Sequence, residues 1–228
     1  MLHIPAIPYI YPICILASFI VSFLIIAQQN KKEYSKETLL YYLLTVFIFS
    51  MFGGMVLSLG ENMIKEHRFQ IGLSSYGGAV GLLTGIWFYK KVINKNIKKL
   101  SVDTVLALPL IYGLSKLACG MNGCCCGFEF KGPLSVIYGE NGPYFPVQFV
   151  ETAVFIFIYI LIIYLNKNKK INKYIIYITM ITAGTAKGLL DFLRSGYSGI
   201  SLNQVISILF IFIGISFLIA NKRKSRPA

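Results

Sequence analysis

The chain has 228 residues, of which 56% are hydrophobic and only 14% are charged, and its mean hydropathy is +0.66. This composition excludes an ordinary water-soluble globule and predicts an integral membrane protein. The formal net charge of +13 does not indicate nucleic-acid binding, because the lysines form short clusters between apolar runs instead of one continuous basic face.

The apolar residues are grouped in stretches that approach the length of a membrane-spanning helix, which is about 20 residues. We therefore predict an all-α integral membrane protein with about seven transmembrane helices, forming a single polytopic domain over residues 1–228. No basic residue precedes the first apolar run, so we expect it to be retained as a helix and not removed as a signal peptide. The stretches are residues 9–27, 38–59, 71–89, 102–122, 145–165, 174–193 and 200–220.

Lysines and arginines are unevenly distributed between these stretches. Clusters occupy every second gap and the C-terminal tail, whereas the alternate gaps hold one or two basic residues each. Because basic loops stay on the cytoplasmic side, we predict that the N-terminus lies outside and the C-terminus in the cytoplasm. The clusters are Lys31, Lys32, Lys36; Lys90, Lys91, Lys95, Lys98, Lys99; Lys167, Lys169, Lys170, Lys173; and Lys222, Arg223, Lys224, Arg226, and the sparse gaps hold Lys65 with Arg68, Lys131, and Arg194.

Polar residues inside the predicted helices lie at a similar depth in this orientation. Lys116 is six residues before Asn122, or about 9 Å along the helix axis from its outer end. Lys187, Asp191 and Arg194 are spaced i, i+4 and i+7, so they share one face of the sixth helix. Asp103, at the inner end of the fourth helix, is the exception to this outer-half distribution.

These polar residues predict a pocket, because ionisable groups inside a membrane are costly and usually mark function. Two cations, a carboxylate, an amide and a phenol suit an anionic ligand. Three structural alternatives stay open: Lys187 could pair with Asp191, Lys116 could neutralise Glu151, or Lys116 could extend its stem outward. The five pocket residues are Lys116, Lys187, Glu151, Gln148 and Tyr76.

The third stretch carries a glycine stripe, with Gly77, Gly81 and Gly85 at intervals of four residues. Such small-xxx-small patterns let membrane helices pack closely, so helix packing is the first interpretation of Ser75-Tyr76-Gly77-Gly78. The region 123–144 is rich in Gly, Pro and Tyr and long for a simple turn. We predict an extracytoplasmic loop there, either a lid or an ordered connector.

Four of the five cysteines lie between Cys119 and Cys126, which is not the pattern of a secreted disulfide framework. No metal ligand is predicted, because zinc sites usually use paired C-x-x-C units or histidines, and His3 and His67 are distant in sequence. An alternative function is a membrane thiol-disulfide oxidoreductase using Cys119 and Cys124–Cys126. The cysteines could also be small packing residues at a helix end.

Four blocks of sequence together resemble the prolipoprotein diacylglyceryl transferase family, in its divergent Gly-Cys-Cys branch. They occur in the family's order and extend over about residues 70–215. The blocks are Ser75-Tyr76-Gly77-Gly78; Lys116-Leu117-Ala118-Cys119-Gly120-Met121-Asn122-Gly123-Cys124-Cys125-Cys126-Gly127; Pro146-Val147-Gln148-Phe149-Val150-Glu151; and Lys187-Gly188-Leu189-Leu190-Asp191-Phe192-Leu193-Arg194, followed by Gln204 in the last helix.

The resemblance implies a multi-pass enzyme of the bacterial cytoplasmic membrane, with its site facing the outer leaflet and no cofactor. Its partners would be the bilayer, a phospholipid donor and a prolipoprotein acceptor. The diacylglyceryl group of phosphatidylglycerol, or of a related anionic phospholipid, would move to the acceptor's cysteine thiol. The implied catalytic residues are Tyr76, Lys116, Glu151 and Lys187, and the implied substrate-binding residues are Gly77, Gly78, Asn122, Gly123, Gln148, Asp191, Arg194 and Gln204.

The chain departs from the family pattern at the residues expected to meet phosphate. The family's two essential arginines fall on Lys116 and Lys187, its histidine on Tyr76, and an acidic residue on Cys124. Lysine acts as a point charge, whereas arginine grips phosphate with two donors. A different donor or acceptor, a lost activity, or a non-enzymatic lipid-binding or transport protein of the same fold therefore stay open.

Overall fold

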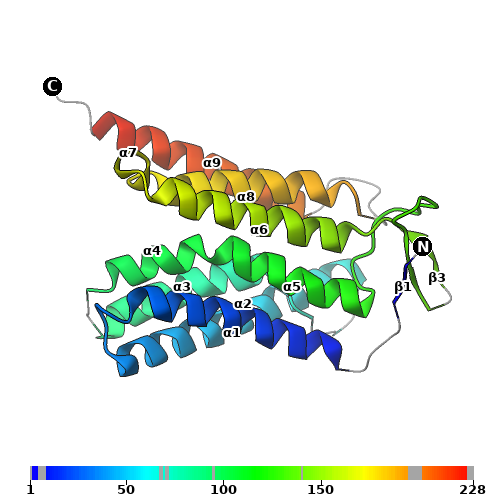
Figure 1. Ribbon diagram of the computed structural model, residues 1–228, viewed down its shortest axis with the longest axis horizontal. Helices are drawn as coiled ribbons and strands as arrows, with labels where there is room; N and C mark the ends of the chain where they lie inside the picture. The colour runs from blue at the N-terminus through cyan, green and yellow to red at the C-terminus, as the bar shows by residue number, and fades with distance from the viewer. Residues whose placement is uncertain are drawn as a thin grey trace. The chain divides into compact units, whose positions relative to one another are not determined.

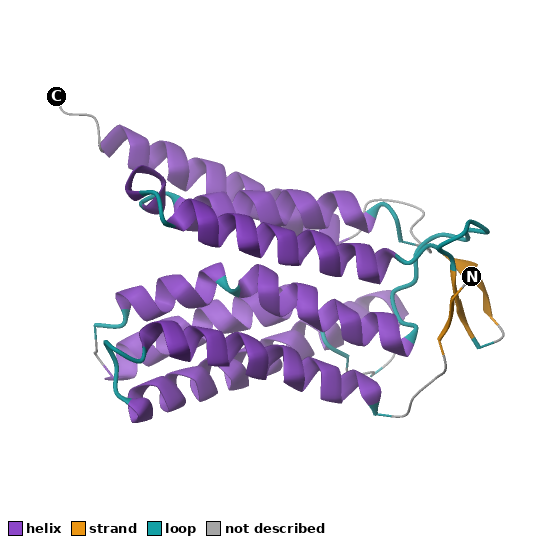
Figure 2. Ribbon diagram, viewed as in Figure 1, coloured by secondary structure: helices purple, strands orange, loops and turns teal. Residues whose placement is uncertain are grey.

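The computed structural model describes residues 2–4, 9–66, 69, 72–93, 96–139, 141–194 and 202–224. It is mostly helical, which confirms the predicted all-α membrane class, and Figure 2 shows the helices with one small group of strands. The chain divides into two compact units. One comprises Met1–Ser18 with Pro109–Ala228, and the other comprises Phe19–Leu108.

The Phe19–Leu108 unit is built around the close packing of α2 (Lys36–Glu66) on α3 (Ser75–Ile93). A Cβ on Gly77 would lie only 2.3 Å from the backbone oxygen of Gly53, and one on Gly81 only 2.1 Å from that of Phe49. No larger side chain fits at such distances. The glycine stripe is therefore confirmed as a packing surface.

Polar contacts in the same unit join α2 and α4 (Lys98–Leu106) with the end of α1 (Ile10–Asn30). Asn30 Nδ2 donates a hydrogen bond of 2.8 Å to Asp103 Oδ2, and the Tyr42 hydroxyl donates one of 3.0 Å to Thr104 Oγ1. Asp103, the polar exception noted in the sequence, is thus a partner of the α1 terminus.

The other unit contains α5 (Leu108–Asn122, from Pro109 onward), α6 (Val147–Asn166), the short α7 (Lys169–Asn172), α8 (Ile175–Asp191) and α9 (Leu202–Lys224). Figure 1 shows α6, α8 and α9 running along one another. Gly113 brings α5 against α6, since its Cβ position is 3.2 Å from Thr152 O and from Phe155 Cβ. Gly184 lets α8 pack closely on α9, since its Cβ position is 3.3 Å from Ser207 O.

A three-stranded sheet lies beyond the end of α5 (Figure 1). Its strands are β1 (Leu2–Ile4), β2 (Val136–Tyr138) and β3 (Asn141–Tyr144), with β1 parallel and β3 antiparallel to β2. The predicted 123–144 loop therefore contains an ordered hairpin that pairs with the start of the chain. Its role as a lid stays a prediction.

Each of the seven predicted stretches contains a helix. Within the described part of the chain, five helices are long and apolar enough to cross a membrane, namely Ile10–Asn30, Lys36–Met63, Lys98–Asn122, Val147–Asn166 and Asn203–Lys222. The remaining two stretches hold α3 and α8, of 19 and 17 residues. The total of seven spans and the orientation stay predictions, and His67, Arg68, Lys95 and Arg226 lie outside the described residues.

Candidate functional site

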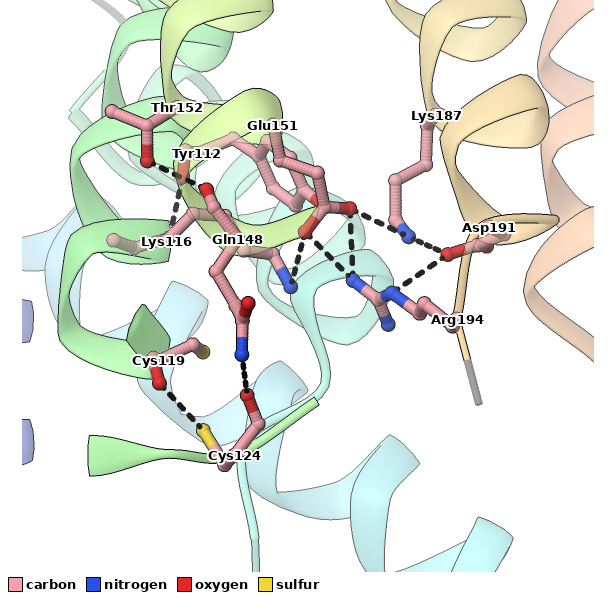
Figure 3. Close-up of polar contacts among 11 residues, drawn as sticks. Tyr112, Lys116, Cys119, Cys124, Gln148, Glu151, Thr152, Lys187, Asp191 and Arg194 are labelled. Carbon is pink, nitrogen blue, oxygen red and sulfur yellow. Dashed lines mark hydrogen bonds and ion pairs between the residues drawn. The ribbon is translucent and has the colours of Figure 1, made fainter. Parts of the chain in front are cut away.

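Glu151 is the centre of a buried ionic cluster. It lies in the second turn of α6, and its side chain is completely buried (0% exposed). Figure 3 shows side chains from α5, α6 and the end of α8 converging on its carboxylate. A buried carboxylate is tolerated only with partners that compensate its lost hydration.

The two lysines predicted from sequence both contact this carboxylate. Lys116 Nζ, from α5, is 3.4 Å from Glu151 Oε2, and Lys187 Nζ, from α8, is 3.5 Å from Oε1. Both lysine side chains are about 95% buried. Residues that are separated by 71 positions in sequence therefore place their ammonium groups on either oxygen of one acid.

Arg194 makes the shortest contacts with the acid among the three cations. Its Nη2 donates hydrogen bonds of 2.8 Å and 3.0 Å to the two oxygens of Glu151. The residue follows the end of α8 and is held by a β-bridge to Gly127. A Cβ on Gly127 would lie 2.5 Å from Phe145 O, so glycine permits this close approach.

Asp191 is the second carboxylate of the cluster and contacts both Lys187 and Arg194. Its Oδ1 accepts a hydrogen bond from Lys187 Nζ, one helical turn earlier, and lies 3.3 Å from Arg194 Nε. The predicted intrahelical pair of Lys187 and Asp191 is therefore present. It does not exclude the pocket interpretation, because Lys187 also reaches Glu151.

Tyr112 is a member of the cluster that the sequence did not single out. Its hydroxyl donates a 2.8 Å hydrogen bond to Glu151 Oε1. Its ring lies 5.2 Å from Lys116 Nζ and 5.8 Å from Lys187 Nζ, within the range of cation–π attraction. The available signal was the i, i+4 spacing of Tyr112 and Lys116, which puts both on one face of α5.

The cluster contains more positive than negative charge. Three cations, Lys116, Lys187 and Arg194, face two carboxylates, Glu151 and Asp191. One excess positive charge in a buried environment favours the approach of a single anion. Burial opposes the charge of Arg194, but the Glu151 carboxylate outweighs it and raises the pKa of Arg194 above its usual range.

Two buried oxygens beside the cluster have no hydrogen-bond partner within the described residues. They are Gln148 Oε1 and Asp191 Oδ2, and both residues are at most 1% exposed. The side-chain amide of Gln148 is held through its nitrogen, because Nε2 donates a 2.8 Å hydrogen bond to Cys124 O. Unpartnered buried acceptors are rare and call for an explanation, such as a bound ligand with hydroxyl groups.

The remaining predicted residues lie in α3, in α9 and at the end of α5. Gln204 is buried in the first turn of α9. Tyr76, Gly77 and Gly78 begin α3 in the other compact unit, where Gly77 packs against Gly53. Their predicted roles, and those of Asn122 and Gly123 at the end of α5, stay predictions.

The cysteine segment closes α5. Gly123 has a left-handed φ of +70°, and Cys124 N–H donates a 3.2 Å hydrogen bond back to Cys119 O, which is the Schellman pattern of a helix C-terminus. Asn122 is exposed at this end. The Cys124 thiol donates to Cys119 O at 3.8 Å.

The chain is similar in sequence to known proteins. A sequence model of the prolipoprotein diacylglyceryl transferase family matches residues 1–220. A phosphatidylglycerol--prolipoprotein diacylglyceryl transferase of Clostridium tetani is 24% identical over 207 residues, covering 82% of each chain. The phosphatidylglycerol--prolipoprotein diacylglyceryl transferase 2 of Clostridium perfringens is 25% identical over 223 residues, covering 89% of this chain and 86% of the relative.

Proposed function

Because the chain belongs to the prolipoprotein diacylglyceryl transferase family, we propose that it transfers a diacylglyceryl group from phosphatidylglycerol, or a related anionic phospholipid, to a prolipoprotein cysteine. The observation that carries this proposal is the convergence of three buried cations on Glu151, with one positive charge in excess. A phosphodiester headgroup carries one negative charge, so its charge matches that excess.

The proposed reaction forms a carbon–sulfur bond and breaks a carbon–oxygen bond. The acceptor thiolate attacks the glycerol carbon of the diacylglyceryl group, and glycerol phosphate leaves with the bonding electron pair on its oxygen. Negative charge therefore grows on the phosphate as the bond breaks. Lys116, Lys187 and Arg194 are the groups that would stabilise this charge, and a desolvated site strengthens their effect.

The acceptor thiol must lose its proton, since the thiolate is the nucleophile. We assign proton acceptance to Glu151. In the structure its oxygens are engaged by Tyr112 and the three cations. Each cation that turns toward an incoming phosphate would free a lone pair on Glu151, which links phospholipid binding to the appearance of the base. Tyr76 is the alternative acceptor that the family resemblance implies.

Gln148 is proposed to orient the headgroup. Its amide nitrogen is fixed by Cys124 O, and its Oε1 is a buried acceptor without a hydrogen-bond partner among the described residues. The free glycerol of phosphatidylglycerol offers two hydroxyl donors to such an acceptor. Gln148 would thus distinguish this donor from phosphatidic acid, which lacks the headgroup glycerol.

The proposal is tested by replacing the two lysines. Purified Lys116→Ala and Lys187→Ala variants would be supplied with phosphatidylglycerol and a lipobox peptide, and the thioether product would be followed by mass. We expect each variant to lose about 10²–10³-fold in rate, as when one donor to a developing oxyanion is removed. Lys90→Ala, at the exposed end of α3, is the control and should keep full activity.

Full turnover in both lysine variants would show that the phosphate assignment is wrong. A wild-type protein that retains anionic phospholipid through purification but forms no thioether with any lipobox peptide would instead favour the non-enzymatic lipid-binding alternative. Both results are read from the same preparations, because the co-isolated lipid and the peptide mass are measured separately.

A further inference from the structure

Three cysteine thiols converge where α5 ends. The sulfur atoms of Cys119, Cys124 and Cys125 all lie within 4.8 Å of one another. Cys119 is buried in the last turns of α5, Cys124 is half-buried and Cys125 is exposed. The group thus has a covered base and one side open to the surroundings.

The backbone explains why these sulfurs meet. The left-handed Gly123 turns the chain back, and the Cys124 N–H···O Cys119 hydrogen bond fixes Cys124 over the last helical turns. Cys125 is itself left-handed, with φ of 57°, which few non-glycine residues adopt. The second reversal brings a third sulfur to the first two.

Neighbouring contacts hold this turn in place from two sides. Gln148 Nε2 donates a 2.8 Å hydrogen bond to Cys124 O, and the Tyr138 hydroxyl donates one of 2.9 Å to Gly120 O. Cys126 is kept out of the group, because its thiol donates to Gly123 O at 3.2 Å. The three sulfurs are therefore positioned by contacts other than a bond between themselves.

We propose that Cys119, Cys124 and Cys125 form a binding site for a soft metal cation, copper(I) or zinc(II). Thiolates are the preferred ligands of both ions. At a Zn–S distance of about 2.3 Å, tetrahedral ligation needs sulfurs roughly 3.8 Å apart, so the group needs to contract by about 1 Å at most. Binding forms three metal–sulfur bonds and releases the thiol protons to solvent.

The local charge supports such a site. Lys116 lies one helical turn before Cys119 and interacts electrostatically with Cys119 and Cys125. Three thiolates on a monovalent or divalent ion leave a negative complex, which a buried cation next to it would stabilise. The sequence predicts no metal ligand, because it has neither paired C-x-x-C units nor closely spaced histidines. The three thiols of the proposed site come instead from a helix end and the turn that follows it.

A disulfide is the competing fate of these thiols, but it uses only two of three sulfurs. It would also require a pair to close from as much as 4.8 Å to about 2.05 Å. A metal ion with trigonal or tetrahedral ligation would instead use all three sulfurs. The left-handed residues Gly123 and Cys125 bring these three sulfurs together. The metal reading therefore accounts for more of the geometry.

The test uses the full chain, purified in detergent with reductant and without oxygen, then stripped with chelator. Zinc(II) and copper(I) would be titrated separately against a competing chelator, and bound metal counted by elemental analysis. We expect one equivalent of at least one ion. Loss of a partner that only hydrogen-bonds to a metal ligand weakens metal binding about 10–100-fold. We expect a larger loss of affinity from each of three single variants, Cys119→Ser, Cys124→Ser and Cys125→Ser.

Two matched controls separate these thiols from the others. Cys14→Ser, in α1, and Cys126→Ser should bind metal as the unmodified chain does. If a variant fails to fold, the unmodified chain still decides: the bound ion should slow alkylation of Cys119, Cys124 and Cys125 but not of Cys14. Substoichiometric binding of both ions, equal protection of all five thiols, or a disulfide within the group in protein isolated without reductant would overturn the proposal.

This test is independent of the proposed transfer reaction. Metal counting and alkylation need neither phospholipid nor acceptor peptide. Full turnover in Lys116→Ala and Lys187→Ala would overturn the phosphate assignment and leave the metal site standing, whereas substoichiometric metal binding by the unmodified chain would overturn the metal site and leave the phosphate assignment standing.

Discussion

Replacing Glu151 by glutamine is the sharpest probe of the ionic cluster. The change removes one negative charge while keeping the shape and a carbonyl that Tyr112 and Arg194 can still donate to. Glu151 now compensates three cations at 2.8–3.5 Å, and its side chain is fully buried. In Glu151→Gln, only Asp191 would remain to balance them.

The expected magnitude follows from burial. Removing one partner of a buried ion pair typically costs about 3–5 kcal/mol, because the remaining charges stay desolvated. In a chain of this size, each kcal/mol lowers the melting temperature by about 2–4 °C. We therefore expect Glu151→Gln to melt roughly 6–20 °C below the unmodified protein, and added anionic phospholipid to recover part of that loss.

Glu33→Gln is the matched control, since Glu33 also pairs with a lysine, Lys99, but both side chains are about half exposed. Exposed pairs contribute about 0–1 kcal/mol, so this variant should melt within a few degrees of the unmodified protein. Thermal unfolding of both variants in one detergent provides the comparison. A Glu151→Gln shift no larger than that of Glu33→Gln would refute the claim that this carboxylate holds the cations together.

Three further changes examine the surroundings of the cluster. Tyr112→Phe removes a hydrogen bond to a charged group, which should cost about 1.5–3 kcal/mol in thermal unfolding; no measurable cost would exclude the phenol as a buried partner. Arg194→Lys keeps the charge but loses the guanidinium fork, so thioether formation should fall about 10–100-fold, and an unchanged rate would contradict a phosphate-binding role. Gly127→Ala would place a Cβ 2.5 Å from Phe145 O and should disturb the bridge to Arg194 and lower both rate and stability, whereas Gly142→Ala has open space around it and is expected to be neutral.

Much of the fold could be predicted from sequence because apolar length is a strong signal. All seven apolar stretches contain helices, and the glycine interval in α3 correctly indicated close packing on α2. The small sheet could not be predicted. Its strands have three or four residues, and β1 pairs with β2 across more than 130 positions, so no local pattern reveals the partner.

The cluster could be predicted only in part, for a related reason. Helical spacing predicted that Lys187, Asp191 and Arg194 share one face; Lys187 and Arg194 both pair with Asp191, although α8 ends at Asp191 and Arg194 is placed by its bridge to Gly127. Which helix faces which is set by side-chain packing, so the shared contact of both lysines with Glu151 was not determined by spacing alone. Tyr112 was missed because the chain has 15 tyrosines and nothing in the sequence sets this one apart; only its hydrogen bond to Glu151 distinguishes it.

Arg194 bears on the prediction that Lys116 and Lys187 stand where the family resemblance implies arginines. A guanidinium has five N–H donors in a fixed plane, whereas an ammonium is a point charge with little directional preference. Arg194 Nη2 contacts both oxygens of Glu151, while its Nε lies 3.3 Å from Asp191 Oδ1 without the alignment of a hydrogen bond. We infer a division of roles in which Lys116 and Lys187 supply charge and Arg194 supplies direction, so that donor selectivity would depend on Arg194 and Gln148 more than on the two lysines.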